Sequence, residues 1–257
     1  MPELQVVVSN RSPRGPRRPL LLGHRGARKH AAENSLAAFD LALEHGCDGF
    51  EFDLHATADR RLIVCHDPKF AGVEIAAETY ESFCQKSGAQ LLPRILKAER
   101  GRLPAKFLPP GLEEVLDRYA HRCFLDIELK VAGMERALVA LLRGQPPQRD
   151  YVVSSFLPEV VRNLTGRDPS IPTGFICDKR SELARWPSLP VGVVIPKHTL
   201  VTRSLLEEVH AAGRKLFVWT VNREREMRRL AEWGVDAILS DDTRLLARAF
   251  SGRKPRA

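Results

Sequence analysis

Short apolar runs alternate with amphipathic segments along most of this chain. Apolar runs of strand length lie at 20–27, 47–56, 121–130, 150–156, 171–178, 191–196, 216–222 and 236–241. Between them, apolar residues recur every three or four positions, as at 111–121 and 202–214, which predicts helices with one buried face. Eight strand–helix alternations in 257 residues predict an α/β protein with a (β/α)8 TIM barrel. A doubly wound sheet is the competing architecture.

The second apolar run contains two carboxylates, Glu51 and Asp53. Residues two apart in a strand point to the same face, and burying two like charges together is costly unless a cation neutralises them. A further apolar run, Leu62 to Cys65, follows a polar turn and ends at His66. If the two runs form an antiparallel hairpin with a two-residue loop at 59 and 60, His66 faces Asp53.

The other strand-like runs also carry polar residues near their ends. These are His24 and Arg25 in the first, Asp126, Glu128 and Lys130 in the third, Trp219, Thr220 and Asn222 in the seventh, and Ser240 and Asp241 in the eighth. Taken singly, each has an ordinary structural explanation, such as a salt bridge, a solvated charge or a core aromatic. In a barrel, however, all of these strand ends surround one mouth, and their convergence favours an active site.

The types of these residues suggest one reaction class. Glu51, Asp53 and Glu128 offer hard oxygen ligands, which suit one divalent cation, Mg²⁺ or Ca²⁺. A cation beside basic side chains makes a positive pocket that can bind a phosphate and stabilise its transition state. Two histidines on opposite sides of that phosphate can serve as base and acid. The residues therefore predict metal-assisted cleavage of a phosphate ester.

Three further patterns divide the chain. Residues 69–111 are irregular, with short helical pieces at 79–86 and 93–100, and we expect them to form an insertion over the barrel mouth. Before them, Asn34 is the expected N-cap of a helix that Gly46 ends. We therefore expect an irregular basic arm at 1–18, one barrel domain at 19–250 and a basic tail at 251–257.

The net charge of +8 is concentrated at the two ends, since seven basic residues lie in the arm and the tail. Basic ends fit an anionic substrate or solubility as well as nucleic acid, but they lack interleaved aromatics, so we expect no nucleic-acid partner. The five cysteines are odd in number and form no C-x-x-C pair, which indicates reduced thiols in a cytoplasmic protein. No apolar run is long enough to span a membrane, and the N-terminus does not have the pattern of a signal peptide.

The motifs resemble those of the glycerophosphodiester phosphodiesterases, within the phospholipase-C-like phosphodiesterase superfamily. The matching segments are GHRGA at 23–27, ENSLAAF at 33–39, GCDGFEFDLHATADRRLIVCHDP at 46–68, GLEEVL at 111–116, DIELK at 126–130, VVSSF at 152–156, FVWTVN at 217–222 and DAILSD at 236–241. They run in order over nearly the whole chain. Ala32, Ser35 and Arg60 depart from the usual family residues, and the segment after Asp67 lacks the family's Leu-x-Arg-Thr-Thr, which leaves the choice of substrate more open than the chemistry.

This resemblance implies a barrel with a small insertion and a role for each candidate residue. The metal ligands would be Glu51, Asp53 and Glu128, the acid/base pair His24 and His66, the phosphate contacts Arg25 and Lys130, and the residue flanking the glycerol Trp219. Glycerophosphodiesters, such as glycerophosphocholine, would be cleaved to sn-glycerol 3-phosphate and an alcohol, with the free glycerol hydroxyl attacking first and water opening the resulting cyclic phosphate. The alternatives are a related phosphodiesterase acting on lysophospholipids or phosphatidylinositol, and a binding protein that kept the barrel without catalysis.

Overall fold

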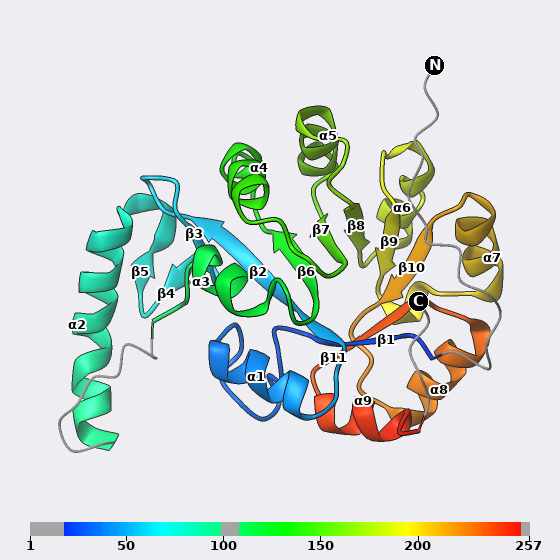
Figure 1. Cartoon of the computed structure of the whole chain (residues 1–257), viewed down its shortest axis with the longest axis horizontal. Helices are drawn as coiled ribbons and strands as arrows, with labels where there is room; N and C mark the ends of the chain where they lie inside the picture. Colours follow the sequence, from blue (N-terminus) through cyan, green and yellow to red (C-terminus); the bar gives the residue numbers. More distant parts are fainter. Residues whose placement is uncertain (1–17, 99–107, 253–257) are drawn as a thin grey trace.

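The computed structural model describes residues 18–98 and 108–252, and its centre is a closed parallel barrel (Figure 1). The eight barrel strands are β1 (Leu20–Gly23), β2 (Gly49–Ala56), β6 (Phe124–Leu129), β7 (Tyr151–Ser155), β8 (Thr173–Cys177), β9 (Val193–Pro196), β10 (Lys215–Val218) and β11 (Ala237–Ser240). They are hydrogen-bonded in the order β1-β11-β10-β9-β8-β7-β6-β2, and β2 pairs again with β1. This closure confirms the predicted (β/α)8 barrel and excludes an open doubly wound sheet.

Helices surround the barrel in the view of Figure 1. They are α1 (Leu36–Glu44), α3 (Leu112–Tyr119), α4 (Glu135–Gly144), α5 (Pro158–Arg167), α6 (Arg180–Leu183), α7 (Arg203–Ala211), α8 (Glu224–Trp233) and α9 (Thr243–Ala249), with 3₁₀ turns η3 (Trp186–Ser188) and η4 (His198–Leu200). Their apolar faces pack on the strands, as where Phe39 of α1 stacks on Phe50 of β2 with ring centroids 4.2 Å apart. Gly49 allows β2 to approach β6 closely, since a Cβ there would lie 1.9 Å from the carbonyl oxygen of Phe124.

The barrel interior is filled by apolar side chains that come mainly from the strands. Leu22, Phe124, Ile176, Phe217 and Leu239 belong to this buried cluster. The interior of the barrel is thus packed, and the polar residues gather at its C-terminal mouth. None of the described helices is both long and apolar enough to cross a membrane.

The second strand continues into the antiparallel strand β3 (Leu62–Val64), but the predicted register was wrong by one residue. Leu54 pairs with Val64 and Ala56 with Leu62, and the backbone nitrogen of Cys65 donates to the backbone carbonyl oxygen of Asp53 at 2.9 Å. Asp53 therefore faces Cys65, not His66. The cause is a wider loop than the expected two residues, since Thr57 bonds both Asp59 and the carbonyl oxygen of Arg61.

The segment expected to be an insertion contains β4 (Lys69–Phe70), β5 (Val73–Glu74), the 3₁₀ turn η1 (Ile75–Ala77) and helix α2 (Tyr80–Ala98). As far as the structure describes them, the two short helical pieces predicted here belong to one helix, α2, which continues through the proline at 93. In Figure 1, α2 lies outside the ring of barrel helices, beside β4 and β5. Buried Phe83, Ile63 and Ile75 join this helix to the hairpin.

The ends of the chain lie mostly outside the described residues. Arg18, the last residue of the expected arm, bonds Asp48 with 3.1 Å between Nη2 and Oδ1. Residues 1–17, 99–107 and 253–257 are not described, so the irregular arm, the basic tail and part of the insertion stay predictions.

Candidate active site

Three buried carboxylates meet at the mouth of the barrel. Glu51 and Asp53 come from β2 and Glu128 from β6, where Asp53 and Glu128 are paired in register. One ligand oxygen from each lies within 4.8 Å of the other two. Glu51 and Asp53 thus lie on one face of the strand, as their spacing predicted, and Glu128 joins them from the neighbouring strand.

Two basic side chains lie against these carboxylates. Lys130 Nζ is 2.7 Å from Glu128 Oε1 and 3.3 Å from Asp53 Oδ1, and Arg25 Nε is 3.2 Å from Asp53 Oδ2. Burial alone would raise the pKa of Asp53, but Lys130 and Arg25 outweigh it and lower that pKa. Burial alone would likewise lower the pKa of Lys130, but Glu128 and Asp53 raise it. The inner carboxylate and the ammonium therefore stabilise each other as ions.

The oxygen atoms of the three carboxylates could still bind a divalent cation. Glu51 Oε1 is buried and has no hydrogen-bond partner in the part of the chain that the structure describes. Burial, followed by the charges of Asp53 and Glu128, raises the pKa of Glu51 well above its ordinary value, and burial with Asp53 raises the pKa of Glu128 to about 7. Mutually repelling oxygen ligands of this kind fit Mg²⁺ or Ca²⁺, whose charge would compensate them.

Arg25 is placed by an unusual backbone conformation just after β1. Its φ is +54°, and its backbone nitrogen donates to Glu51 Oε2 at 2.8 Å. The guanidinium then reaches both Asp53 and Glu33, the latter at 2.8 Å from Nη1. A positive φ is uncommon outside glycine, and here it accompanies a residue that contacts two site carboxylates.

His24 is held by a carboxylate from the other end of the chain. Its Nδ1 bonds Asp241 Oδ1 at 2.7 Å, and its Nε2 lies 3.9 Å from Glu51 Oε2. Asp241 Oδ2 accepts from Asn222 Nδ2 at 2.6 Å, so the carboxylate is itself fixed. With Nδ1 protonated and donating to Asp241, Nε2 is free to accept a proton on the side of the carboxylates.

His66 lines the same cavity as His24 although the predicted hairpin register was wrong. Its Nδ1 bonds the adjacent Asp67 Oδ1 at 2.8 Å. The side chain is one-third exposed, with a relative accessibility of 33%. A positive charge on His66 would also lower the pKa of Asp53.

The cavity at the mouth has a volume of about 200 Å³. Besides the acidic, basic and histidine side chains, its lining includes Trp219, Phe156, Ile176, Ile195 and Leu239. Trp219 Nε1 donates to the carbonyl oxygen of Ile195 at 3.0 Å, and the ring meets Phe156 edge-on at 5.4 Å. The structure thus brings all eight candidate residues to one place, with apolar walls beside the charged groups.

Asn34 is a site residue that the sequence analysis assigned to another role. Ser35, not Asn34, is the N-cap of α1, where its side chain accepts from the backbone nitrogen of Ala38. Asn34 has a φ of +56° and donates from Nδ2 to Asp53 Oδ2 at 2.8 Å. Asparagine tolerates this conformation, so the prediction failed because two capping residues stand side by side.

Asp126, noted in the sequence without a role, is buried and lines the cavity. Ser154 Oγ donates to its Oδ1 at 2.6 Å. Burial raises the pKa of Asp126 to about 7, with a further contribution from Asp53. Its position two residues before Glu128 was the available signal, because residues two apart share a face of the strand.

The sequence of this chain is similar to those of known proteins. The model of the Glycerophosphoryl diester phosphodiesterase family matches residues 24–245. YhdW of Bacillus subtilis is 31% identical over 86% of this chain and 93% of its own length. A glycerophosphodiester phosphodiesterase of Caldanaerobacter subterraneus is 29% identical over 88% of this chain and 96% of its own length.

Solved structures are similar over nearly the whole chain. A glycerophosphodiester phosphodiesterase from Agrobacterium tumefaciens is 25% identical, with a TM-score of 0.75 over 91% of this chain and 100% of that one. An Oleispira antarctica phosphodiesterase, solved in complex with the product sn-glycerol-3-phosphate, is 23% identical, with a TM-score of 0.73 over 90% of this chain and 96% of that one. Together with the match to the family model, this likeness establishes that the chain is an enzyme and a member of the glycerophosphoryl diester phosphodiesterase family.

Proposed function

We propose that this enzyme hydrolyses glycerophosphodiesters to sn-glycerol 3-phosphate and an alcohol, with one divalent cation and two histidines. The observation that carries the proposal is one cavity of about 200 Å³ whose lining includes two basic side chains, two histidines and two members of the three-carboxylate cluster, Glu51 and Glu128. The Oleispira antarctica phosphodiesterase of the same fold binds sn-glycerol-3-phosphate, which supports that product for this chain.

The cation would be held by Glu51, Asp53 and Glu128, the three carboxylates that the described residues bring together. When bound, Mg²⁺ or Ca²⁺ supplies positive charge that polarises a phosphate oxygen. Arg25 and Lys130 stand at the edge of the same cluster and would bind the remaining phosphate oxygens. Fixed cations aimed at the phosphate favour the transition state, in which its charge is greatest.

The two histidines have different surroundings, which suggests different roles. His24 lies on the side of Trp219, with ring centroids 6.4 Å apart, and Trp219 would flank the glycerol. His24 Nε2 would therefore accept the proton of the attacking glycerol hydroxyl. His66 would donate a proton to the oxygen of the departing alcohol, and water would then open the cyclic phosphate with the two roles reversed.

Release of glycerol 3-phosphate from glycerophosphocholine tests this proposal directly. The purified protein should be active with Mg²⁺ or Ca²⁺ and inactive after chelation, and His24→Ala should be inert. Absence of product with either metal would refute the function. Release of the headgroup from micellar lysophospholipid, with no activity on soluble diesters, would favour the related lipid-cleaving activity instead.

The partner we propose is therefore a small phosphodiester and not nucleic acid.

The five cysteines are free, and four of them are buried. Unpaired buried thiols are typical of reducing compartments, which supports a cytoplasmic location. Localisation of a tagged protein in cell fractions would test it.

A further inference from the structure

His55 is a buried histidine of β2 to which the proposed function gives no role. Its exposed fraction is 7%, and it lies two residues after Asp53, so the two side chains leave the strand on the same face. Its partner in the strand ladder is Ile63 of β3. The ring does not belong to the lining of the cavity at the barrel mouth, so any effect on the site must pass through another residue.

The ring of His55 is bonded to the backbone of the proposed proton donor. Its Nε2 lies 3.1 Å from the carbonyl oxygen of His66. A carbonyl oxygen only accepts hydrogen bonds, so Nε2 carries a hydrogen and is the donor. The bond joins β2 to the loop that follows β3, and it ends on a residue whose side chain lines the cavity.

The strand pairing that fixes β3 ends before His66. The backbone nitrogen of Cys65 still bonds the carbonyl oxygen of Asp53 at 2.9 Å. Further along, the carbonyl oxygen of Pro68 accepts from a backbone nitrogen, also at 2.9 Å. The segment between these two points forms a bend. The bond from His55 therefore holds the backbone in the part of the loop that strand pairing does not reach.

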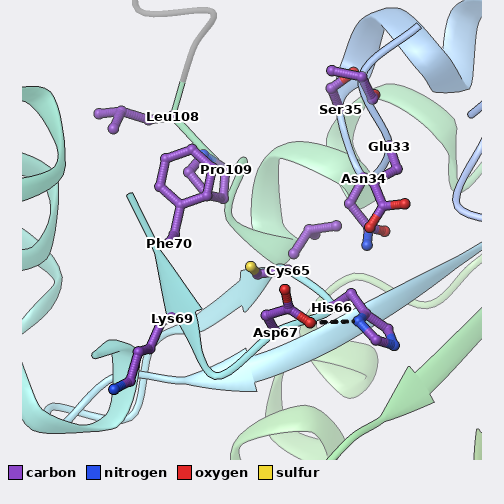
Figure 2. Close-up of a pocket in the computed structure, with 12 residues that line it drawn as sticks. Glu33, Asn34, Ser35, Cys65, His66, Asp67, Lys69, Phe70, Leu108 and Pro109 are labelled. Atoms are coloured by element: carbon purple, nitrogen blue, oxygen red, sulfur yellow. Dashed lines mark hydrogen bonds and ion pairs between the residues drawn. The ribbon is translucent and has the colours of Figure 1, made fainter. Parts of the chain in front are cut away.

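The side-chain partner of His66 gives the ring little orientation of its own. Its Nδ1 bonds Asp67 Oδ1 at 2.8 Å (Figure 2). The Asp67 side chain is 74% exposed and belongs to the same loop. Exposed ion pairs of this kind contribute little. The position of the ring relative to the barrel therefore depends on the backbone of residue 66, which His55 holds.

We infer that His55 is a positioning residue, which holds His66 within reach of the departing oxygen by donating a hydrogen bond to its carbonyl oxygen. The inference rests on the proposed function, in which His66 is the proton donor. A proton donor acts only within hydrogen-bond reach, about 2.6–3.2 Å. A displacement of about 1 Å can lower a rate about 100-fold.

The choice of leaving group isolates the step in which His66 would act. As the bond between phosphorus and the alcohol oxygen breaks, its electron pair passes to that oxygen, and the proton of His66 neutralises it. Choline needs this proton, whereas p-nitrophenolate delocalises its charge and departs as an anion. The readout is kcat/KM for release of the alcohol, which reports the steps up to its departure. Glycerophosphocholine is compared with the p-nitrophenyl diester of glycerol 3-phosphate.

Two substitutions of His55 differ in whether they keep the bond. His55→Gln keeps an N–H donor at a similar distance from the backbone, and His55→Met fills a similar space without one. His55→Met should lower kcat/KM for choline release about 10- to 100-fold and for nitrophenol release less than about threefold. His55→Gln should stay within about threefold of the wild type on both substrates. If His55→Met does not fold, His55→Asn takes its place, because its amide is one methylene too short.

Two further variants frame the result. His66→Ala should show the same selective loss of choline release. His45→Met is the matched control, since this partly buried ring bonds Thr243 at 2.7 Å and lies outside the cavity lining, and it should leave both substrates unchanged. Equal losses on the two substrates in His55→Met, wild-type choline release in that variant, or an equal loss in His55→Gln would overturn the inference.

Metal binding separates an effect on His66 from an effect on the carboxylates. By calorimetry, His55→Met should bind Mg²⁺ or Ca²⁺ with the affinity of the wild type. A fall in metal affinity as large as the fall in choline release would mean that the substitution acts through Asp53, and the inference would be wrong.

Backbone NMR relaxation separates the inference from the proposed function, because it needs no substrate. The amide order parameters of residues 66 and 67 should fall in His55→Met from about 0.85 toward about 0.6, and they should stay high in His55→Gln. If that pattern holds while no diester is cleaved, the proposed function fails and the positioning of residue 66 stands. If diesters are cleaved but the order parameters of His55→Met equal those of the wild type, the inference fails.

Discussion

Replacing Asp241 by asparagine tests whether its bond to His24 serves catalysis. Asp241 Oδ1 meets His24 Nδ1 at 2.7 Å, and Oδ2 accepts from Asn222 Nδ2 at 2.6 Å. The Asn222 amide cannot simply turn over, because its oxygen accepts from Ser240 Oγ and from the backbone nitrogen of residue 241. An amide at 241 has one acceptor oxygen where the carboxylate has two, so only one of the two donors keeps its partner.

Either orientation of that amide weakens His24 as a base. If the new amide nitrogen faces Nδ1, the ring proton moves to Nε2, which can then no longer accept one. If the oxygen faces Nδ1, the negative charge that stabilises the protonated ring is still lost. A hydrogen bond to a charged group contributes about 1.5–3 kcal/mol, which corresponds to a fall in rate of about 10- to 150-fold.

The loss should fall on kcat, because Asp241 stabilises a charge that forms on His24 only as the proton moves. Initial rates of glycerol 3-phosphate release should show kcat reduced about 10- to 150-fold and KM changed less than about threefold. Asp242→Asn is the matched control, since Asp242 bonds Lys29 and the backbone nitrogen of Leu245 and not His24. Wild-type kcat in Asp241→Asn, or an equal loss in Asp242→Asn, would refute the reasoning.

Three other measurements follow from the structure. Glu128→Gln should weaken Mg²⁺ or Ca²⁺ binding at least about tenfold by calorimetry, because it removes one charged ligand oxygen, and unchanged affinity would contradict the carboxylate site. Lys130→Met should lower the free energy of unfolding, measured by urea denaturation without added metal, by about 3 kcal/mol, because the buried carboxylates lose the Lys130 ammonium that neutralises them. Equal stability of the variant and the wild type would argue against that compensation. Burial acts to raise the pKa of Asp242, but hydrogen bonds from Lys29, the Leu245 nitrogen and His30 outweigh it and lower the pKa to about 2. Because this folded pKa is below the unfolded value of about 3.9, the stabilisation by Asp242 is present above about pH 4 and lost toward pH 2. The stability difference between wild type and Asp242→Asn should therefore disappear at low pH, and a difference independent of pH would be the contrary result.

The barrel could be predicted from the sequence because its pattern is local. Strands buried on both faces read as short apolar runs, and helices packed on one face show a three-to-four-residue spacing. The charged residues at the mouth were visible for the same reason, since Glu51, Asp53 and Glu128 interrupt runs that are otherwise apolar. Their grouping required only the rule that parallel strand ends meet at one side of a barrel.

The hairpin register could not be predicted, because it depends on side-chain bonds within the loop. Asp59 and Arg60 have the composition of a two-residue turn. However, Thr57 Oγ1 donates to Asp59 Oδ1 at 2.6 Å and accepts from the backbone nitrogen of Arg61 at 3.0 Å. These bonds lengthen the loop and shift every facing pair by one. His66 still reaches the cavity, because it lies two residues beyond the end of β3 and is not paired in the strand ladder.

The groups that would position the two proposed acid–base histidines were harder to assign than the histidines themselves. Asp67, the partner of His66, is the next residue in the chain, whereas Asp241, the partner of His24, is 217 residues away. The distant partner is available because β11 pairs with β1, so that the end of the last barrel strand lies beside the end of the first. An open sheet with β1 in its interior would separate these two ends and leave the Nδ1 of His24 without its carboxylate. Closure of the barrel therefore does more than bury a core, since it supplies the group that orients one of the two proposed acid–base residues.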